Sequence, residues 1–470
     1  MLDQSFSAHN FEIIFTIENR KGHVDITTMS TTYQDILGKI KDIRVKARDI
    51  RKKKKLDRTS KEVSDLKKFD LEIKNLQKEK TEALAEDMAS IADEVNSHSF
   101  KFKLDKHLYG DKEEFTLENS RASYYAMKQL LHNMKRTFKI EMLGRHQIMT
   151  AIKHLLNMSM PIFIIRTDVQ NFYESIPQDA LFQKVYDNNL LSFKSKSFIK
   201  QIFYAYETIK DPSKTPINKG VPRGIGISAM LSELYMQDID KELKSRTGVI
   251  FYVRYVDDIF MILTSLGSFG TLNKYYHNMQ DFFKSKGLKL QSIGSDKCKL
   301  IKYSPGESGS ISFDYLGYKL NLSKTSDGLI TKYSLSDKKI KKINDRIEKA
   351  FKHFETLSKI NIKAARRDLL DSLNYITGNF RLSNSKSHAK AGLYYSNDLL
   401  DNLEELDQFT ATLHSHTITP YSKLFSKGDK KKFIDALSKH IKKIDFKQRW
   451  IARKMYNFPL SRIAEISSWL

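Results

Sequence analysis

The stretch VIFYVRYVDDIFMIL, residues 249–263, decides the fold. Two runs of apolar, mostly β-branched and aromatic residues flank Asp257 and Asp258. Such runs favour β-strands, and aspartate is common in turns because its side chain hydrogen-bonds the local backbone. The stretch therefore predicts a β-hairpin with two carboxylates at its tip, although an Asp-Asp turn alone is usually only a turn.

A second apolar run also ends in aspartate. PIFIIRT, residues 161–167, predicts a short strand, and Asp168 follows it directly. We expect both strand regions to point their aspartates at solvent from the edge of one sheet. Carboxylates gathered in this way can hold two divalent ions for phosphoryl transfer. Because Mg²⁺ prefers oxygen ligands and keeps several waters, two or three aspartates suffice.

The charge balance indicates a polyanionic partner. The chain has 470 residues, with 80 lysines and arginines against 56 acidic residues and a net charge of +24. A basic surface attracts nucleic acid, because each neutralised phosphate releases condensed counterions. The alternative is that the lysines only keep the protein soluble. An apolar content of 40% indicates a globular chain, long enough for two or three domain-sized units.

Cysteine usage and hydropathy indicate the compartment. The single cysteine, Cys298, excludes an intramolecular disulfide and a cysteine-based zinc site, which favours a reducing environment. Residues 1–15 lack a signal-peptide pattern, and no run of about 18 apolar residues occurs. We expect a cytoplasmic protein without a membrane partner.

Helical patterns surround the two strand regions. Between residues 33 and 95 apolar positions recur every three or four residues, and the basic run 51–55 divides this segment, which predicts a helical hairpin. Its lysines and arginines have two interpretations, contact with a phosphate backbone or a solvated helix face. Residues 120–157 and the chain after residue 337 are also helix-rich, whereas residues 313–320 predict a strand or tight hairpin. The whole predicts an α+β core with helical additions at both ends.

Three segments resemble the motifs of one family. DVQNFY, residues 168–173, resembles motif A of reverse transcriptases, GVPRGIGIS, residues 220–228, resembles motif B, and YVDD, residues 255–258, resembles motif C, in the same order and at similar spacing. The resemblance implies an RNA-directed DNA polymerase, a nucleotidyltransferase with a right-hand fold. In such a fold a palm with an antiparallel sheet and helices carries fingers and a helical thumb.

The resemblance also implies the roles of the acidic residues. The catalytic residues would be Asp168, Asp257 and Asp258, and the metal site would consist of Asp168, Val169, Asp257 and Asp258. The implied cofactor is a pair of Mg²⁺ ions, with Mn²⁺ as the alternative ion.

Nucleotide-binding positions follow from the same motifs. Tyr173 matches the aromatic residue under the incoming sugar, where a ring would clash with a 2′-hydroxyl and favour deoxynucleotides. The alternative is a core aromatic residue. Motif B departs from the family, because Arg223 stands where most relatives have glutamine, and this permanent cation puts ordinary base-pair checking in doubt. Gly224 would still let the backbone approach the nascent base pair.

The remaining positions are carried over from the family's outer motifs. Lys139 and Arg145 resemble cations of the fingers that bind triphosphate, and Lys297 resembles the lysine of motif D, for which Lys299 competes. Each is equally consistent with a surface charge. Residues 313–318 resemble motif E, whose primer grip would contain Tyr315, Leu316 and Gly317.

The resemblance divides the chain into four parts. We expect an N-terminal region with the helical hairpin at residues 1–97, fingers at 98–160, a palm at 161–320 that includes part of the fingers at 180–220, and a helical, basic thumb and C-terminal RNA-binding region at 321–470.

The narrower likeness is to bacterial reverse transcriptases of the defence-associated, unknown-group kind, most of all the type 3 a subunit. It is carried by the altered motif B and by the stretches NFEIIF, residues 10–15, and ENRKG, residues 18–22. It implies antiphage defence, a noncoding RNA as template or scaffold, deoxynucleoside triphosphates as substrates, a DNA product and a second reverse transcriptase subunit.

Several readings stay open. Homo-oligomerisation is one of them. The alternative functions are a retron-type reverse transcriptase, a template-independent DNA polymerase of the abortive-infection kind, a polymerase that makes RNA from RNA, and a binding protein that uses the palm only as a scaffold.

Overall fold

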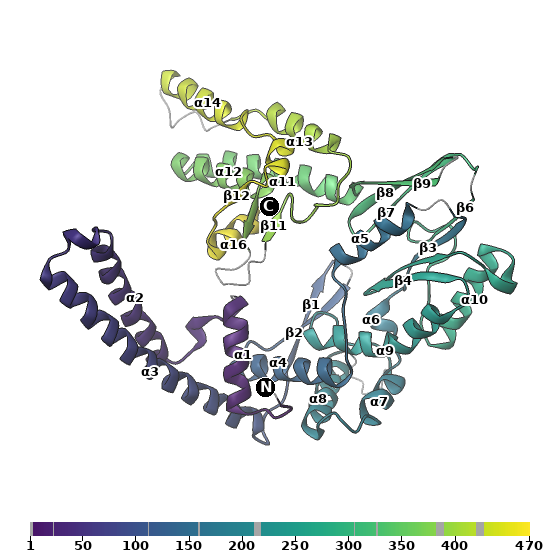
Figure 1. Ribbon diagram of the computed structural model, residues 1–470, viewed down its shortest axis with the longest axis horizontal. Coiled ribbons are helices and arrows are strands. Elements are labelled where there is room, and N and C mark those ends of the chain that lie inside the picture. Colours follow the sequence, from purple (N-terminus) through teal and green to yellow (C-terminus); the bar gives the residue numbers. More distant parts are fainter. Residues whose placement is uncertain are drawn as a thin grey trace.

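The structure is a computed structural model that describes residues 3–21, 23–110, 112–157, 160–210, 218–304, 306–325, 328–381, 390–419 and 427–470. A core of antiparallel sheets and helices lies at one side, and helical segments from both ends of the chain extend from it in an open arc (Figure 1). This mixed architecture confirms the α+β class expected from the sequence.

The central sheet has four antiparallel strands in the order β4-β5-β3-β6. These strands are β3 (Ile162–Asp168), β4 (Val249–Tyr255), β5 (Asp258–Leu263) and β6 (Lys299–Tyr303). The strands expected around residues 161–167 and 249–263 are therefore confirmed. β5 lies between β3 and β4, so the aspartates at the ends of β3 and β5 come from neighbouring strands.

The sheet is buried on both faces, which explains why its strands are almost continuously apolar. Alternate residues of a strand point to opposite faces. Accordingly Ile165 and Met261 belong to one hydrophobic core with α9 (Gly226–Ser245) and α10 (Leu272–Ser285). Ile164 belongs to a second core, which includes residues of the three-stranded sheet below.

The second sheet follows the first in the chain. It has the order β7-β8-β9, with β7 (Gly309–Tyr315), β8 (Tyr318–Thr325) and β9 (Gly328–Leu335). The hairpin of β7 and β8 confirms the tight hairpin expected near Gly317, whereas β9 was not expected. The helix α5 (Arg145–Leu156) packs against β9, because Tyr333 donates its hydroxyl to the carbonyl of Met149 at 3.0 Å.

The N-terminal region forms the expected helical hairpin. It consists of α1 (Ala8–Lys21), α2 (Thr31–Arg51) and α3 (Ser60–Asn96). The root of the hairpin is tied to α4 (Arg121–Thr137), since Arg121 lies 3.5 Å from Asp87 of α3, which also accepts a hydrogen bond from the backbone of Ser30. Its other end points away from the core (Figure 1).

The segment between the N-terminal region and motif B adds a hairpin and several helices. These elements are β1 (Leu104–Tyr109), β2 (Lys112–Leu117), α6 (Phe172–Ser175), α7 (Gln178–Tyr186) and α8 (Phe193–Lys210). The β1-β2 hairpin was not expected from the sequence, because five of the six residues of β1 are exposed and most of them are polar.

The C-terminal region is mainly helical, as expected, with a small three-stranded sheet. Its elements are α11 (Asp337–Ser358), α12 (Ile362–Thr377), β10 (Asn379–Arg381), β11 (Lys390–Gly392), α13 (Glu404–Ser415), α14 (Lys427–Ile441), α15 (Phe446–Ile451), β12 (Met455–Tyr456) and α16 (Leu460–Trp469). It is joined to the core through Asp401, which pairs with Lys153 of α5 at 2.6 Å and accepts the backbone N–H of Tyr333 at 2.8 Å.

Within the residues that the structure describes, no helix is both long and apolar enough to cross a lipid bilayer.

A buried ionic cluster fixes α1 to the core. Glu18 is 5% exposed, and its carboxylate lies 2.6 Å from Lys128 of α4, 2.8 Å from Lys21 and 3.1 Å from His23. Burial by itself raises the pKa of Glu18, but the hydrogen bonds from Lys128, Lys21 and His23 lower it to about 2. The folded pKa is thus below the ordinary value of 4.5.

We predict that Glu18→Gln lowers the free energy of unfolding by about 2 kcal/mol at pH 7, because the charged partners lose their carboxylate. Since the folded pKa is depressed, this stabilisation is complete above pH 4.5 and is lost as the pH falls toward 2. Urea unfolding of both proteins at several pH values measures the difference. Glu72→Gln, on the exposed face of α3, should leave the unfolding curve unchanged; an equal loss there would contradict the assignment.

Candidate active site

The two-residue turn between β4 and β5 carries the motif C carboxylates. Tyr255 and Asp258 are opposite each other in the hairpin, which leaves Val256 and Asp257 as the turn. Val256 has φ of 59°, a left-handed conformation that is strained for a β-branched residue. The surrounding structure must therefore hold this turn in place.

Arg254 holds the turn from inside the hairpin. Its Nη1 donates to the carbonyl of Val256 at 2.8 Å, and its side chain is only 2% exposed. Two acids of α9 neutralise it: Glu233 and Asp240 each lie 2.7 Å from Nη2. Tyr252 donates to Asp240 at 2.7 Å. The guanidinium thus ties the strained turn to the helix behind the sheet.

β3 brings Asp168 to the same place. Asp168 is the direct partner of Asp258 across the β3-β5 ladder, and just beyond it the N–H of Val169 donates to the carbonyl of Asp257 at 3.0 Å. Residues about 90 positions apart in the chain therefore present three carboxylates at one sheet edge. The expectation that all of them face solvent was wrong for Asp168, which is 3% exposed because the loop of residues 289–291 covers it.

Cationic and amide groups contact two of the carboxylates. Asp168 accepts from Lys297 at 2.8 Å and from the amide of Gln291 at 3.0 Å. Asp258 pairs at 3.0 Å with Arg166, which lies two residues before Asp168 on β3. Lys297 is half exposed and can move, whereas Arg166 is 9% exposed and fixed in the sheet. Asp258 is thus held by a fixed ion pair with Arg166. Asp168 is held by contacts with Lys297 and Gln291 that another cation could replace.

The acids repel one another. Burial raises the pKa of Asp257, and the nearby charge of Asp168 raises it further. Burial also raises the pKa of Asp258 to about 6; Arg166 opposes this rise, and the charges of Asp257 and Asp168 add to it. Neighbouring carboxylates that disfavour their own ionisation are the electrostatic setting that a bound cation relieves.

The donor set fits a divalent cation of the Mg²⁺ type. In the part of the chain that the structure describes, no group of three or more His, Cys, Asp or Glu side chains is arranged to hold a metal ion by itself. Mg²⁺ does not require such a group, because it commonly binds one or two carboxylates and completes its shell with water and substrate phosphate. Asp168 and Asp257 supply those carboxylates.

Motifs A and B are joined beside the carboxylates. The carbonyl of Tyr173 accepts the N–H of Val221 at 2.8 Å, and the carbonyl of Ile176 accepts the N–H of Gly220 at 2.7 Å. The side chain of Gln178 also donates to the carbonyl of Gly220, at 2.9 Å. The two loops therefore form one unit, in which Tyr173 is half-buried.

The arginine that departs from the family pattern is paired with a neighbour of Tyr173. Arg223 donates from Nε and Nη2 to Glu174 at 2.8 to 3.1 Å, in a two-pronged arrangement. Its guanidinium carbon lies 5.3 Å from the centre of the Tyr173 ring. Arg223 thus contacts both the candidate sugar-binding tyrosine and the acid that follows it.

Gly224 permits a close approach between motif B and the β1-β2 hairpin. It has φ of 104°, and a side chain there would come within 2.5 Å of the carbonyl of Phe115 on β2. The N–H of Phe115 donates to the carbonyl of Arg223 at 2.7 Å. The unexpected hairpin therefore rests directly on motif B, and the sequence signals that could have revealed it are the turn at Gly110 and the alternation around Phe115.

The candidate primer grip is the turn of the β7-β8 hairpin. Leu316 and Gly317 both have positive φ, 43° and 80°, as a two-residue hairpin turn requires. Tyr315 has its ring 5.2 Å from that of Phe260 on β5; burial raises the pKa of its hydroxyl, and the charge of Asp258 adds to this rise. The turn thus lies next to the carboxylate edge.

The predicted cations of the fingers lie elsewhere. Arg145 donates to the carbonyls of Leu316 at 3.3 Å and Ser396 at 2.5 Å, so it joins the primer-grip turn to the C-terminal region. Lys139 lines a cavity of about 530 Å³ together with Glu233 and Asp240, the acids that hold Arg254. Neither residue is seen in contact with the three aspartates.

Sequence reasoning passed over two residues that the structure places in the site. Arg254 stands inside a stretch that the sequence predicts as apolar strand, and Glu174 directly follows the segment that resembles motif A, so neither was singled out. A charge in the middle of an otherwise apolar strand is a signal for a buried ion pair, because an unpaired charge there would be costly. The partners of Arg254 lie 14 and 21 residues away, so they could not have been named.

A family comparison agrees with this geometry. Residues 118–320 match the reverse transcriptase (RNA-dependent DNA polymerase) family. The matched region includes the sheet edge, both motif loops and the β7-β8 turn. The chain therefore contains a reverse transcriptase domain, with a right-hand polymerase fold and the activity of an RNA-directed DNA polymerase. Domains of this kind use divalent metal ions. None of the curated proteins matches the chain.

Among solved structures, three polymerases illustrate the range of similarity. Apo telomerase from Candida tropicalis is 13% identical over 79% of this chain and 67% of that chain, with a TM-score of 0.37. Telomerase from Candida albicans with the TWJ fragment of telomeric RNA is 13% identical over 74% and 61% of the two chains, with a TM-score of 0.32. The BmCPV RNA-dependent RNA polymerase is 9% identical over 60% and 26%, with a TM-score of 0.30.

We predict that Arg254→Met lowers the free energy of unfolding by about 3 kcal/mol, because Glu233 and Asp240 would stay buried without their cation. Arg51→Met is the matched control. It removes an arginine that pairs with Asp70 on the surface, where both side chains are more than half exposed, and should cost less than about 1 kcal/mol. Denaturant unfolding of the three proteins measures both effects. Equal losses would show that the buried network of Arg254, Glu233 and Asp240 stabilises the fold no more than a surface ion pair does.

Proposed function

We propose that Asp168 and Asp257 bind two Mg²⁺ ions, with Mn²⁺ as an alternative, and that Asp258 is the neighbouring catalytic carboxylate. The observation that supports this most is the pairing of Asp168 with Asp258 across β3 and β5, with Asp257 in the adjoining turn. Val169 contributes to the same site through its backbone, which is bonded to that of Asp257.

The chemistry divides between the ions and the chain. When bound, the ions would activate the primer 3′-hydroxyl and stabilise the charge on the transferring phosphoryl group. Asp168 and Asp257 orient these groups by their fixed positions at the sheet edge. Lys297 lies 2.8 Å from Asp168, a position from which it would donate a proton to the leaving pyrophosphate. Tyr315, Leu316 and Gly317 position the primer end from the next sheet.

Three of the four parts of the chain receive their roles from this arrangement. We assign residues 98–160, with part of 180–220, to the fingers, residues 161–320 to the palm, and residues 321–470 to the thumb and an RNA-binding region. The contact of β2 with motif B supports a role of the fingers in covering the nucleotide. Lys139 and Arg145 would reach a triphosphate only after a rearrangement.

The biological role that we propose is antiphage defence in a bacterium, with a noncoding RNA as template or scaffold and a second reverse transcriptase subunit as partner. Arg223 in motif B and the N-terminal stretches at residues 10–15 and 18–22 support it, because they resemble the type 3 a subunit of defence-associated reverse transcriptases. The net charge of +24 suits an RNA partner in the cytoplasm.

We predict that the wild-type protein co-purifies with a noncoding RNA and its DNA copy, and extends DNA when Mg²⁺ and deoxynucleotides are supplied. Asp257→Asn should lower extension by at least about 100-fold, because the ions that would stabilise transition-state charge lose a carboxylate ligand, while RNA affinity stays nearly the same. Sequencing of the bound nucleic acids identifies template and product together.

Asp281→Asn, on the exposed face of α10, is the control for this experiment and should polymerise normally. Wild-type extension by Asp257→Asn would refute the assignment of roles. Loss of protection against phage in cells that carry Asp257→Asn tests the biological role, and unchanged protection would separate defence from polymerisation.

We further propose that Tyr173 excludes ribonucleotides and that Arg223 and Glu174 position it. Arg223 covers one face of the ring and is itself fixed by the two-pronged contact with Glu174. Burial raises the pKa of the Tyr173 hydroxyl, so the ring stays neutral beside Asp257. An arginine can serve this purpose because its flat guanidinium stacks on an aromatic ring and binds a carboxylate at the same time.

We predict that Arg223→Gln lowers the preference for deoxy- over ribonucleotides about fivefold, which corresponds to roughly the 1 kcal/mol of one cation–π contact. Arg223→Lys should keep only part of the preference, because lysine lacks the planar guanidinium that stacks on the ring and forms a bidentate ion pair. The measurement is kcat/KM for each nucleotide type. If Arg223→Gln lowers both values equally, Arg223 binds nucleotides without positioning the tyrosine.

A further inference from the structure

The free end of the N-terminal hairpin is a basic tip, which we define as residues 44–68. It contains 12 lysines and arginines against four acidic residues, a net charge of +8. The rest of α3, residues 69–96, contains three lysines against eight acidic residues, a net charge of −5. The charge is thus segregated along one hairpin, which a general excess of lysine codons does not explain.

No residue of the basic tip belongs to either of the two hydrophobic cores. Within the tip, Ala47 of α2 is buried. The next buried residue along the hairpin is Leu76 of α3, which lies outside the tip. Every lysine of the tip is exposed. Although three cations pair with acids, no acidic side chain of the described residues lies within ion-pair distance of Lys54 or Lys55. The tip therefore presents charge that its own fold does not neutralise.

The tip is also ordered before any partner binds. Thr59 and Glu62 form a capping box at the start of α3, and Lys53 pairs with Glu62 at 2.5 Å. Arg58 donates to the carbonyls of Arg51 at 3.2 Å and Lys53 at 3.0 Å. Cations held on a fixed scaffold lose less conformational freedom when a ligand binds.

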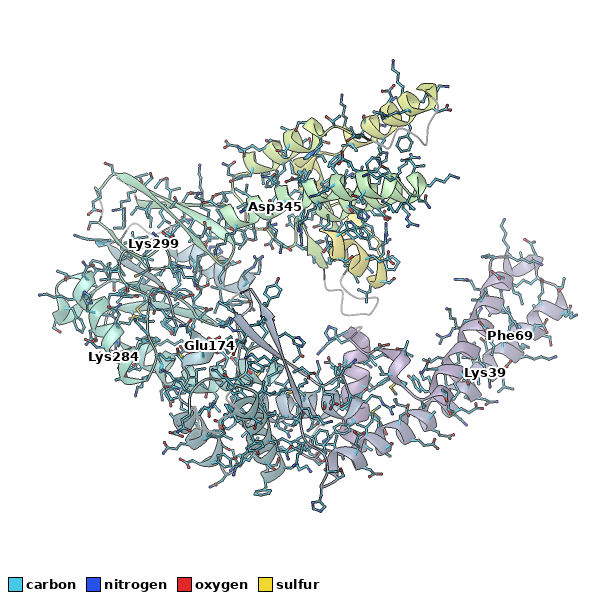
Figure 2. All side chains as sticks on the ribbon, turned by 180° about the vertical axis from the view of Figure 1, so that it is seen from behind. Lys39, Phe69, Glu174, Lys284, Lys299 and Asp345 are labelled. Carbon is cyan, nitrogen blue, oxygen red and sulfur yellow. The ribbon has the colours of Figure 1, made fainter. Side chains whose placement is uncertain are left out.

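The position of the tip separates it from the candidate active site. α2 has 21 residues and so spans roughly 30 Å, and it points away from the strands that carry the aspartates (Figure 1). Figure 2 shows Lys39 and Phe69 on the two helices of the hairpin, apart from Glu174 in the core. A partner at the tip is therefore not the base pair being formed.

We infer that the basic tip binds the phosphate backbone of a double-helical segment of RNA, in a part of the RNA that is not being copied. This rests on the proposed function, in which a structured RNA is the template or scaffold. Residues 44–68 contain no Phe, Tyr, Trp or His, so the tip has no platform on which unpaired bases could stack. Duplex RNA is recognised through shape, phosphates and 2′-hydroxyls, for which exposed lysines suffice.

The test compares Lys54→Glu/Lys55→Glu with Lys74→Glu/Lys78→Glu in the full chain. Both pairs lie on the same hairpin and change the charge equally, but the second pair lies in the acidic part of α3. The probe is a blunt-ended RNA duplex of mixed sequence, titrated at several salt concentrations. We expect the first variant to bind about tenfold more weakly and to reduce the slope of log K against log salt by about 2, whereas the second behaves like wild type.

Three outcomes overturn the inference. The tip variant keeps the affinity and salt slope of wild type, the control variant loses as much, or the tip variant loses a protein partner while duplex binding is unchanged. Primer extension on a short primed template, measured on the same samples, tests the proposed function separately. A wild-type protein that extends nothing refutes the polymerase roles, while the duplex titration still decides about the tip.

Discussion

The arrangement of the site depends on one strained turn that a buried arginine holds in place. Val256 adopts a left-handed conformation that a β-branched residue avoids, and Arg254 bonds its carbonyl from within the sheet. A buried guanidinium is costly unless it is fully paired, and Glu233 and Asp240 of α9 supply that pairing. The position of Asp257 in the turn is therefore fixed by contacts with a helix on the far side of the sheet rather than by the hairpin alone.

The same edge must keep acids close together without a permanent neutralising partner for all of them. Arg166 is fixed in the sheet and offsets Asp258, whereas the half-exposed Lys297 offsets Asp168. Asp257 has no comparable ion pair among the described residues, and its raised pKa reflects burial and the charge of Asp168. The three carboxylates therefore differ in their availability for a cation. Asp258 is held by Arg166 in the sheet, whereas Asp168 and Asp257 remain available to bind one.

The sequence predicted those parts of the fold that short-range patterns encode. The strands of residues 161–167 and 249–263 and the hairpin near Gly317 follow from apolar runs and turn residues, and the helical hairpin follows from spacing. The pairing of Asp168 with Asp258 needed the resemblance of motifs A and C as well. The network of Arg254 and the docking of Phe115 on Gly224 could not be predicted, because each depends on contacts between distant segments. Arg145 shows the converse: its place in a motif was recognisable, but its carbonyl partners at Leu316 and Ser396 were not.

Arg223 and Lys54 show that cations of one chain can have different roles. Arg223 forms a bidentate ion pair with Glu174 and lies over the ring of Tyr173. Its charge is therefore neutralised within the fold, where it positions these two neighbours. Lys54 forms no ion pair with an acidic side chain of the described residues, and it stands at the free end of the hairpin, beyond the part that packs into a core. Net charge alone does not distinguish the two, since both count equally toward +24. The two cations differ in whether the fold supplies a counter-charge. Glu174 neutralises Arg223, whereas the surface around Lys54 stays positively charged and attracts a polyanion.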